Sequence, residues 1–109
     1  MERGSVRHDP AAHRFTLATE DGDAVLAYEP AGDVDGRARV VFTHTVVPEA
    51  AGGQGVGSRL VRAALAQARE SGWVVVPQCP FVAAYLDRHP DEGAGLVRRG
   101  AERVDGTPG

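Results

Sequence analysis

The first half of the chain has the pattern of β-strands, because polar and apolar side chains follow one another with a period of two. Residues 14–19 alternate in this way, with Phe15 and Leu17 on one side. Residues 24–28 form a more apolar run, and residues 37–47 form a longer one that is rich in Val, Thr and Phe. The pattern therefore predicts three strands.

Turn signals separate these three runs. Residues 20–23 contain Gly22, which adopts a positive φ at little cost, so we expect a tight turn there. Residues 29–36 contain Pro30, Gly32 and two aspartates, which predicts a loop. Short connections between successive strands favour an antiparallel meander.

After Pro48 the apolar spacing changes to that of a helix. Apolar side chains recur at i, i+1, i+4, i+5 and i+8, at Leu60, Val61, Ala64, Leu65 and Ala68. Gly72 follows this stripe and is typical of a helix C-terminus. The spacing predicts an amphipathic helix that ends at about residue 71.

A second strand-and-helix pair follows. Residues 73–76, Trp-Val-Val-Val, are a continuous apolar run that is typical of an interior strand. Pro80 suits the first turn of a helix, where the missing N–H costs nothing, and Pro90 ends that helix at about His89. The third strand, the first helix and this strand then form a β-loop-α-β unit.

These elements predict an α/β fold with a mixed sheet of about four to five strands and two main helices. The sheet would begin as the antiparallel meander and end with the β-loop-α-β unit. We expect the folded domain to span residues 13–90. Residues 1–12 show no periodicity and predict a flexible lead-in, whereas residues 91–109 are Gly-rich and charged and predict a flexible tail.

Size and composition restrict the class of protein. A chain of 109 residues fits one domain, and 42% hydrophobic with 25% charged residues are ordinary values for a soluble globular protein. The formal net charge of −3, without a basic stripe, argues against nucleic acid as a partner.

The same composition bears on the compartment. No apolar run approaches the roughly 20 residues of a membrane span, and the first residues lack the apolar stretch of a signal peptide. The chain has one cysteine, Cys79, which cannot form an internal disulfide. We therefore expect a cytoplasmic protein. His8 and His13 are isolated in the sequence, so no metal site is predicted.

The most informative segment is a glycine-rich loop between the third strand and the first helix, Gly52-Gly53-Gln54-Gly55-Val56-Gly57-Ser58. Glycines allow a phosphate to approach the backbone N–H groups, and the helix directs the positive end of its dipole at the same point. Arg59 and Arg62 add positive charge nearby. The segment thus predicts an anion-binding site, and the alternative is a surface turn before a core helix.

The spacing argues against two common nucleotide loops. A dinucleotide-binding loop needs glycine where Ser58 stands, and a Walker A loop needs Lys followed by Ser or Thr after its last glycine, whereas Ser58 and Arg59 follow Gly57. Neither NAD nor a nucleoside triphosphate is therefore the expected anion.

The segment from Thr45-Val46-Val47-Pro48 to Leu60-Val61 resembles the cofactor motif of the GCN5-related N-acetyltransferases. Gly55 and Gly57 match the glycines of the family pattern [QR]-x-x-G-x-[GA], and Gly52 replaces its leading Gln or Arg. The resemblance implies acetyl-CoA as cofactor. It also implies that residues 52–58 hold the pyrophosphate and that the backbone of Val46 and Val47 binds pantetheine.

A second segment, residues 76–90 with the block Cys79-Pro80-Phe81, resembles the compact branch of this family. That branch includes the vertebrate N-acetyltransferase domain-containing protein 1 and its small plant and bacterial homologues. The resemblance covers residues 13–90, and it implies a small enzyme that acetylates an amine.

Three residues are candidates for the chemistry. Cys79 follows a buried strand and precedes a helix N-terminus, a location that lowers the pKa of a thiol, so it is a candidate to accept the acetyl group. The alternative is a small buried hydrophobic residue. His44, predicted to share a strand face with Val40, Phe42 and Val46, is a candidate general base or a structural histidine.

The third candidate is Tyr85, on the second predicted helix. Its position resembles that of the tyrosine that protonates the CoA sulfur in the wider family. Helical spacing also brings it near Phe81, so packing is the alternative role.

The function expected is acetyl-CoA-dependent transfer of an acetyl group to a primary amine, either a protein lysine or N-terminus or a small amine. One alternative is a CoA-binding sensor or partner module without turnover. Another is a redox-responsive protein that uses Cys79 as a sensor thiol.

Overall fold

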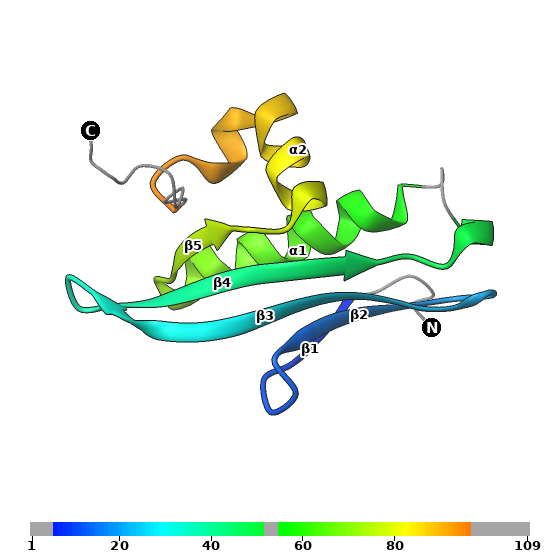
Figure 1. The fold of residues 1–109 in the computed structure, drawn as a ribbon, viewed down its shortest axis with the longest axis horizontal. Helices are drawn as coiled ribbons and strands as arrows, with labels where there is room; N and C mark the ends of the chain where they lie inside the picture. Colours follow the sequence, from blue (N-terminus) through cyan, green and yellow to red (C-terminus); the bar gives the residue numbers. More distant parts are fainter. Residues whose placement is uncertain (1–5, 52–54, 97–109) are drawn as a thin grey trace.

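The computed structural model describes residues 6–51 and 55–96, and within them five strands form one mixed sheet (Figure 1). In order across the sheet these are β1 (Val6–Asp9), β2 (Arg14–Thr19), β3 (Gly22–Val34), β4 (Arg37–Val46) and β5 (Val74–Pro77). Strands β1 to β4 pair antiparallel, and β5 lies parallel to β4. The predicted α/β class with an antiparallel meander and a β-loop-α-β unit is confirmed.

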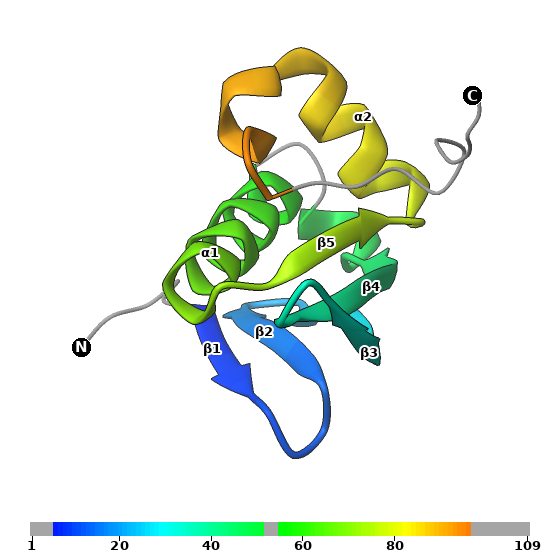
Figure 2. The ribbon, with the colours of Figure 1, turned by 90° about the vertical axis from the view of Figure 1, so that its left-hand side faces the viewer.

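The helices of the described residues are α1 (Val56–Ser71), α2 (Pro80–Arg88) and the short 3₁₀ segments η1 (Glu49–Ala51) and η2 (Pro90–Gly93). Helix α1 packs on β1, β2 and β3, whereas α2 packs on β4 and β5. Figure 2 shows α1 within the curve of the sheet and α2 beyond it on the β5 side.

The loop predicted for residues 29–36 is wrong, because β3 continues to Val34 and forms a long hairpin with β4. The turn contains only Asp35 and Gly36, with φ of 52° and 81°. Two successive residues with positive φ are what a type I′ hairpin turn requires. Pro30 lies beside a register shift of the ladder, where its missing N–H is tolerated.

The flexible lead-in predicted for residues 1–12 is also corrected, since residues 6–9 form β1 on β2. Val6 pairs with Leu17 and His8 pairs with Phe15. The His8 ring stacks on Phe15 with centroids 4.3 Å apart. A strand with only two inward residues, one of them histidine, is too short to show a period in the sequence.

The core lies between α1, α2 and the inner face of the sheet. The predicted apolar stripe of α1 is buried as expected, and Gly72 caps the helix with φ of 72°. Helix α2 begins at Pro80 and ends at Arg88, before Pro90, as predicted. It contributes Val82, Tyr85 and Leu86 to the core.

The chain beyond α2 remains part of the fold as far as Leu96, which differs from the flexible tail predicted from residue 91. Leu96 is 5% exposed, and its carbonyl accepts a hydrogen bond from the N–H of Val75 at 2.8 Å. A single apolar anchor among glycines and charges gives no periodic signal, which is why composition suggested a tail. Residues 97–109 of that predicted tail lie outside the described residues.

Candidate active site

Strands β4 and β5 separate after Phe42. The ladder pairs Arg39–Phe42 of β4 with Val74–Pro77, whereas β4 continues to Val46 (Figure 1). The N–H of Cys79 donates to the carbonyl of Phe42 at 2.9 Å and closes the ladder. Among the described residues, the last four residues of β4 therefore have no strand partner on the β5 side. An open strand edge of this kind can pair with an extended ligand.

A β-bulge lies at the point of separation. Ala27 of β3 pairs with His44, and Tyr28 pairs with Phe42, so Thr43 is an extra residue in β4. The extra residue reverses which of the following side chains face the core. Before Thr43 the even-numbered residues Val40 and Phe42 point inward, and after it the odd-numbered Thr45 does.

The bulge corrects the predicted surroundings of His44. His44 shares the outer face of the sheet with Val46 and is exposed, whereas Val40 and Phe42 are buried on the inner face. Thr45 takes the inward position instead. The sequence prediction assumed strict alternation of side chains along the whole strand. The bulge interrupts this alternation, so the prediction placed His44 on the wrong face.

Thr45 and Cys79 meet on the inner side of the separation. The Thr45 hydroxyl oxygen lies 3.4 Å from the Cys79 sulfur. Cys79 is 2% exposed and occupies the N-cap position of α2 in an extended conformation, as its place between strand and helix predicted. Its own carbonyl accepts the N–H of Ala83 at 2.9 Å. Thr45 was missed by sequence analysis, and only knowledge of the bulge would have found it.

The N-terminus of α1 presents backbone N–H groups without a side-chain cap. Gly55 is the N-cap residue with φ of 76°, and no side-chain cap hydrogen bond forms there within the described residues. The N–H of Arg59 makes the first helical bond, to the carbonyl of Gly55 at 3.0 Å. The N–H groups of the first turn therefore lack helical acceptors and suit an anion. Gly52, Gly53 and Gln54 of the predicted loop lie outside the described residues.

Gly57 in that first turn is in contact with Phe81 of α2. A Cβ on Gly57 would lie 2.9 Å from Cε1 of the Phe81 ring and closer still to Cζ. Phe81 is 39% exposed and is one of two exposed large apolar residues in the described part of the chain. The sequence assigned Gly57 to phosphate approach, and it gave no sign that an aromatic ring lies against it.

Tyr85 is buried, and its hydroxyl is directed at η2. The phenol donates to a carboxylate oxygen of Glu92 at 2.7 Å. Burial raises the pKa of Tyr85, the hydrogen bond to Glu92 raises it further, and Arg62 of α1 opposes both effects. The phenol therefore stays protonated at neutral pH. Its ring also contacts His89, with centroids 4.6 Å apart.

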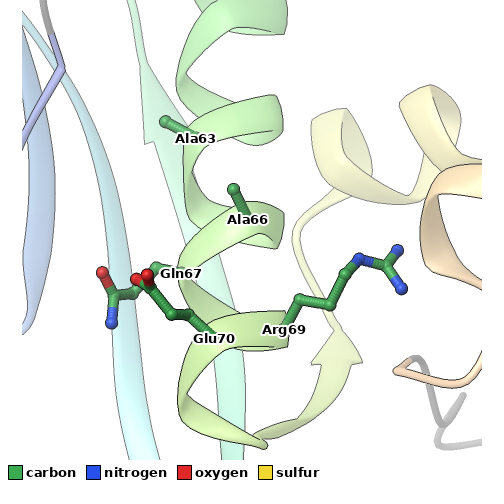
Figure 3. A pocket seen from close by; sticks show the side chains of 5 residues that line it. All are labelled: Ala63, Ala66, Gln67, Arg69 and Glu70. Carbon is green, nitrogen blue, oxygen red and sulfur yellow. The ribbon is translucent and has the colours of Figure 1, made fainter.

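A shallow hollow elsewhere on α1 makes a poor site. It is lined by Ala63, Ala66, Gln67, Arg69 and Glu70 (Figure 3). All five come from one helix, and Arg69 turns away to donate to the carbonyls of Glu92 and Ala94. A binding site needs polar groups that converge from several elements, so this hollow does not qualify.

The predicted site residues thus fall into separate groups. Cys79 lies at the strand separation, and Gly55, Val56, Gly57 and Ser58 lie at the start of α1, which Phe81 links to the same region. His44 is on the outer face, and Tyr85 is bonded to Glu92. Val46 is exposed on the outer face, and Val47 packs partly on the core.

An open strand edge beside a helix N-terminus suits a ligand that has both an extended amide arm and a phosphate group. The chain belongs to the GCN5-related N-acetyltransferase family, whose model matches residues 14–95. This membership supports acyltransferase activity, and the family generally uses acetyl-CoA as its acetyl donor. A comparison with curated proteins finds no match for the chain.

Two further classes of feature are absent from the described residues. They contain no group of three or more His, Cys, Asp or Glu side chains placed to hold a metal ion. None of their helices has the length and apolar character needed to cross a membrane.

Proposed function

We propose that this protein is an acetyl-CoA-dependent N-acetyltransferase of the compact branch that transfers an acetyl group to a primary amine. The observation that carries the proposal is the separation of β4 from β5 at Phe42, with the Cys79 thiol on its inner side. The open strand edge and the Cys79 thiol lie together, and Phe81, two residues after Cys79, contacts the first turn of α1.

The cofactor would be held by backbone groups at both ends of its arm. The pyrophosphate of acetyl-CoA would accept hydrogen bonds from the first-turn N–H groups of α1 and from the loop at residues 52–55. The amide groups of the pantetheine arm would pair with the open edge of β4, around Val46 and Val47. This arrangement directs the thioester toward the region of Thr45 and Cys79.

A covalent route would use Cys79 as the nucleophile. Its thiolate attacks the thioester carbonyl carbon, the bond from that carbon to the CoA sulfur breaks, and CoA leaves as a thiolate that takes up a proton. The neutral amine then attacks the acetyl-cysteine carbonyl, releases the Cys79 thiolate and gives up its extra proton to solvent or a base. The contact with Thr45 supports this role, because the hydroxyl is placed to hydrogen-bond the sulfur.

His44 and Tyr85 remain predictions as catalytic groups. A base at His44 requires the amine to approach from the outer face of β4, where His44 is exposed. An acid at Tyr85 requires the phenol to leave Glu92. An unchanged pH–rate profile in His44→Gln, or unchanged turnover in Tyr85→Phe, would assign a structural role to each.

Mass spectrometry of the intact protein after incubation with acetyl-CoA tests the covalent route. The chain contains one cysteine and no lysine, so an acetyl group on a side-chain sulfur or amine can only be on Cys79. We expect one acetyl adduct that is lost when an amine is added and that is absent in Cys79→Ala. A Cys79→Ala enzyme with full kcat would exclude the covalent route and leave direct transfer.

A CoA-binding module without turnover is the second candidate. It is favoured by the burial of Cys79 and by the failure of His44 and Tyr85 to converge on it. Release of CoA in a single turnover, measured with a panel of amines, distinguishes the two. Tight CoA binding without any release from acetyl-CoA would replace the enzyme with the binding module.

A further inference from the structure

The contact between Gly57 and Phe81 joins two parts of the proposed site. Gly57 is the second residue of α1, and Phe81 is the second residue of α2, two positions after Cys79. The ring lies over the first turn of α1 so closely that a Cβ at Gly57 would require the ring to move. Real Cβ atoms essentially never approach an atom as closely as this one would approach the ring.

Backbone conformation does not require glycine at this position. Gly55 has φ of 76°, whereas Gly57 lies inside α1 and is not among the glycines with positive φ. Within a helix, glycine is less favourable than alanine by about 1 kcal/mol. Glycine at position 57 therefore runs against the helix preference, and the contact with the Phe81 ring gives a steric reason for it.

Phe81 is unusual among the large apolar residues because 39% of its surface remains exposed. Its neighbours on the inner side of α2, Val82 and Tyr85, are buried almost completely. The ring thus packs on the α1 turn with one part and faces solvent with another. The ring therefore links the uncapped end of α1, which it contacts at Gly57, to the start of α2, where Cys79 is the N-cap residue.

We propose that Phe81 and Gly57 form a matched steric pair, in which the Phe81 ring is the wall that positions the thioester arm of bound acetyl-CoA between the α1 N-terminus and Cys79. The role of the ring rests on the proposed function. The absence of a side chain at Gly57 then serves the placement of the ring and not the approach of the phosphate. Phe81 is a positioning residue and takes no part in the bond changes.

Calorimetry with two ligands tests the role of the ring. One ligand is CoA, and the other is 3′-phosphoadenosine 5′-diphosphate, which carries the phosphates without the arm. Phe81→Ala should weaken CoA about tenfold, because a large aromatic surface no longer packs on the arm, and leave the armless nucleotide within about twofold. A general loss of structure would weaken both ligands equally.

The double variant separates the two explanations of Gly57. Gly57→Ala should push the ring aside and weaken CoA about as much as Phe81→Ala does, and Gly57→Ala with Phe81→Ala should bind CoA as Phe81→Ala alone does. Should Gly57→Ala weaken the armless nucleotide as well, in either background, glycine is needed for the phosphate and the inference is wrong.

Thermal unfolding measures the steric pair without any ligand. Gly57→Ala should lower Tm by about 5 °C or more when Phe81 is present, and should leave Tm unchanged or raise it when Phe81 is alanine. An equal shift in both backgrounds would overturn the pair. If the wild-type protein binds no CoA, the proposed function and the role of the ring fail together, whereas this unfolding cycle still decides the steric pair.

Discussion

The two ends of α1 differ in whether other parts of the fold bind their unpaired backbone groups. At the C-terminal end, the backbone that follows the helix binds its carbonyls, because Gly72 N–H donates to Arg69 at 3.4 Å and Trp73 N–H donates to Ala68 at 2.9 Å. The Arg37 guanidinium then donates to the carbonyls of the next two residues, Gly72 at 2.9 Å and Trp73 at 2.8 Å. The turn that ends the helix is therefore held by hydrogen bonds within the fold.

At the N-terminal end, the described residues supply no such partner. Gly55 caps the helix without a side chain, and the nearest close packing is an apolar ring on Gly57. The unpaired groups at this end are donors with a partial positive charge. The comparison shows that one helix can have carbonyls bound within the fold at one end and have N–H groups without a side-chain cap at the other.

The largest effect is expected from Arg37→Ala, which removes the support at the C-terminal end. Three carbonyls, those of Gly72, Trp73 and Gly95, lose a charged donor, and we expect the free energy of unfolding to fall by about 2–4 kcal/mol. Urea unfolding measures the loss. Arg39→Ala is the matched control, since exposed Arg39 bonds a single carbonyl, that of Ala31, and should cost less than about 1 kcal/mol. Equal losses of unfolding free energy in the two variants would mean that the carbonyl bonds of Arg37 do not stabilise the fold more than an exposed arginine does.

A smaller effect on stability, but a sharper contrast, is expected from the two capping glycines. Gly55 and Gly72 have φ of 76° and 72°, and a Cβ added to either would meet no atom within 4 Å beyond its chain neighbours. Alanine at either position should therefore cost a similar amount, about 1–2 kcal/mol, from the left-handed conformation alone.

Only one of these two variants should affect the cofactor. Calorimetry should show CoA binding weakened about tenfold in Gly55→Ala, because the first-turn N–H groups lose their geometry, and unchanged within about twofold in Gly72→Ala. Equal affinity in the two variants would mean that the N-terminal end of α1 is not the anion site.

The sequence predicted the regular part of this fold well. The α1 stripe, its Gly72 stop, the strand after it and the start of α2 at Pro80 each carry a local signal, and all are confirmed. The elements that it missed have weak local signals. Strand β1 has two inward residues, and the segment after α2 depends on one leucine, so both are fixed by tertiary contacts.

The candidate site was predictable only in part for a similar reason. Cys79 at a helix start follows from residue types and spacing, and so does a glycine-rich loop that leads into α1. The bulge at Thr43, which exchanges His44 for Thr45 on the inner face, is a property of strand pairing that one strand's sequence does not show. The ring over Gly57 joins residues 24 positions apart and is equally invisible to a local pattern.

A smaller effect is expected from Thr45→Val, which tests the contact with Cys79 near the N-terminal end of α1. Valine keeps the shape of threonine and removes the oxygen that lies 3.4 Å from the Cys79 sulfur. We expect the initial rate of Cys79 acetylation to fall about three- to tenfold, as the loss of one hydrogen bond implies, with little change in stability. Time-resolved mass spectrometry measures the rate. Thr45→Ser, which keeps the oxygen, should retain most of it, and a slow Thr45→Ser would point to packing instead.

The smallest expected effect is a dependence of stability on pH. It comes from His8, which links β1 to β3 at the edge of the sheet. The His8 Nε2 atom lies 2.7 Å from the Tyr28 hydroxyl. Burial lowers the pKa of His8 below 6.5, and nearby Asp9 opposes the shift in part. Because the folded pKa is the lower one, the unfolded chain binds more protons between the two values. The contribution of His8 is therefore complete above pH 6.5 and is lost as the pH falls through the folded pKa.

Urea unfolding of wild type and His8→Gln across pH 5 to 8 would measure this contribution, since glutamine does not titrate in that range. We expect the gap between the two proteins to be largest at the alkaline end and to narrow on acidification. CoA affinity should follow no such trend in the variant, because His8 lies at the C-terminal end of α1, near Trp73, and not at the end with the uncapped N–H groups. A gap that widened on acidification would mean that the imidazolium is the stabilised form, and that Asp9 outweighs burial at this position.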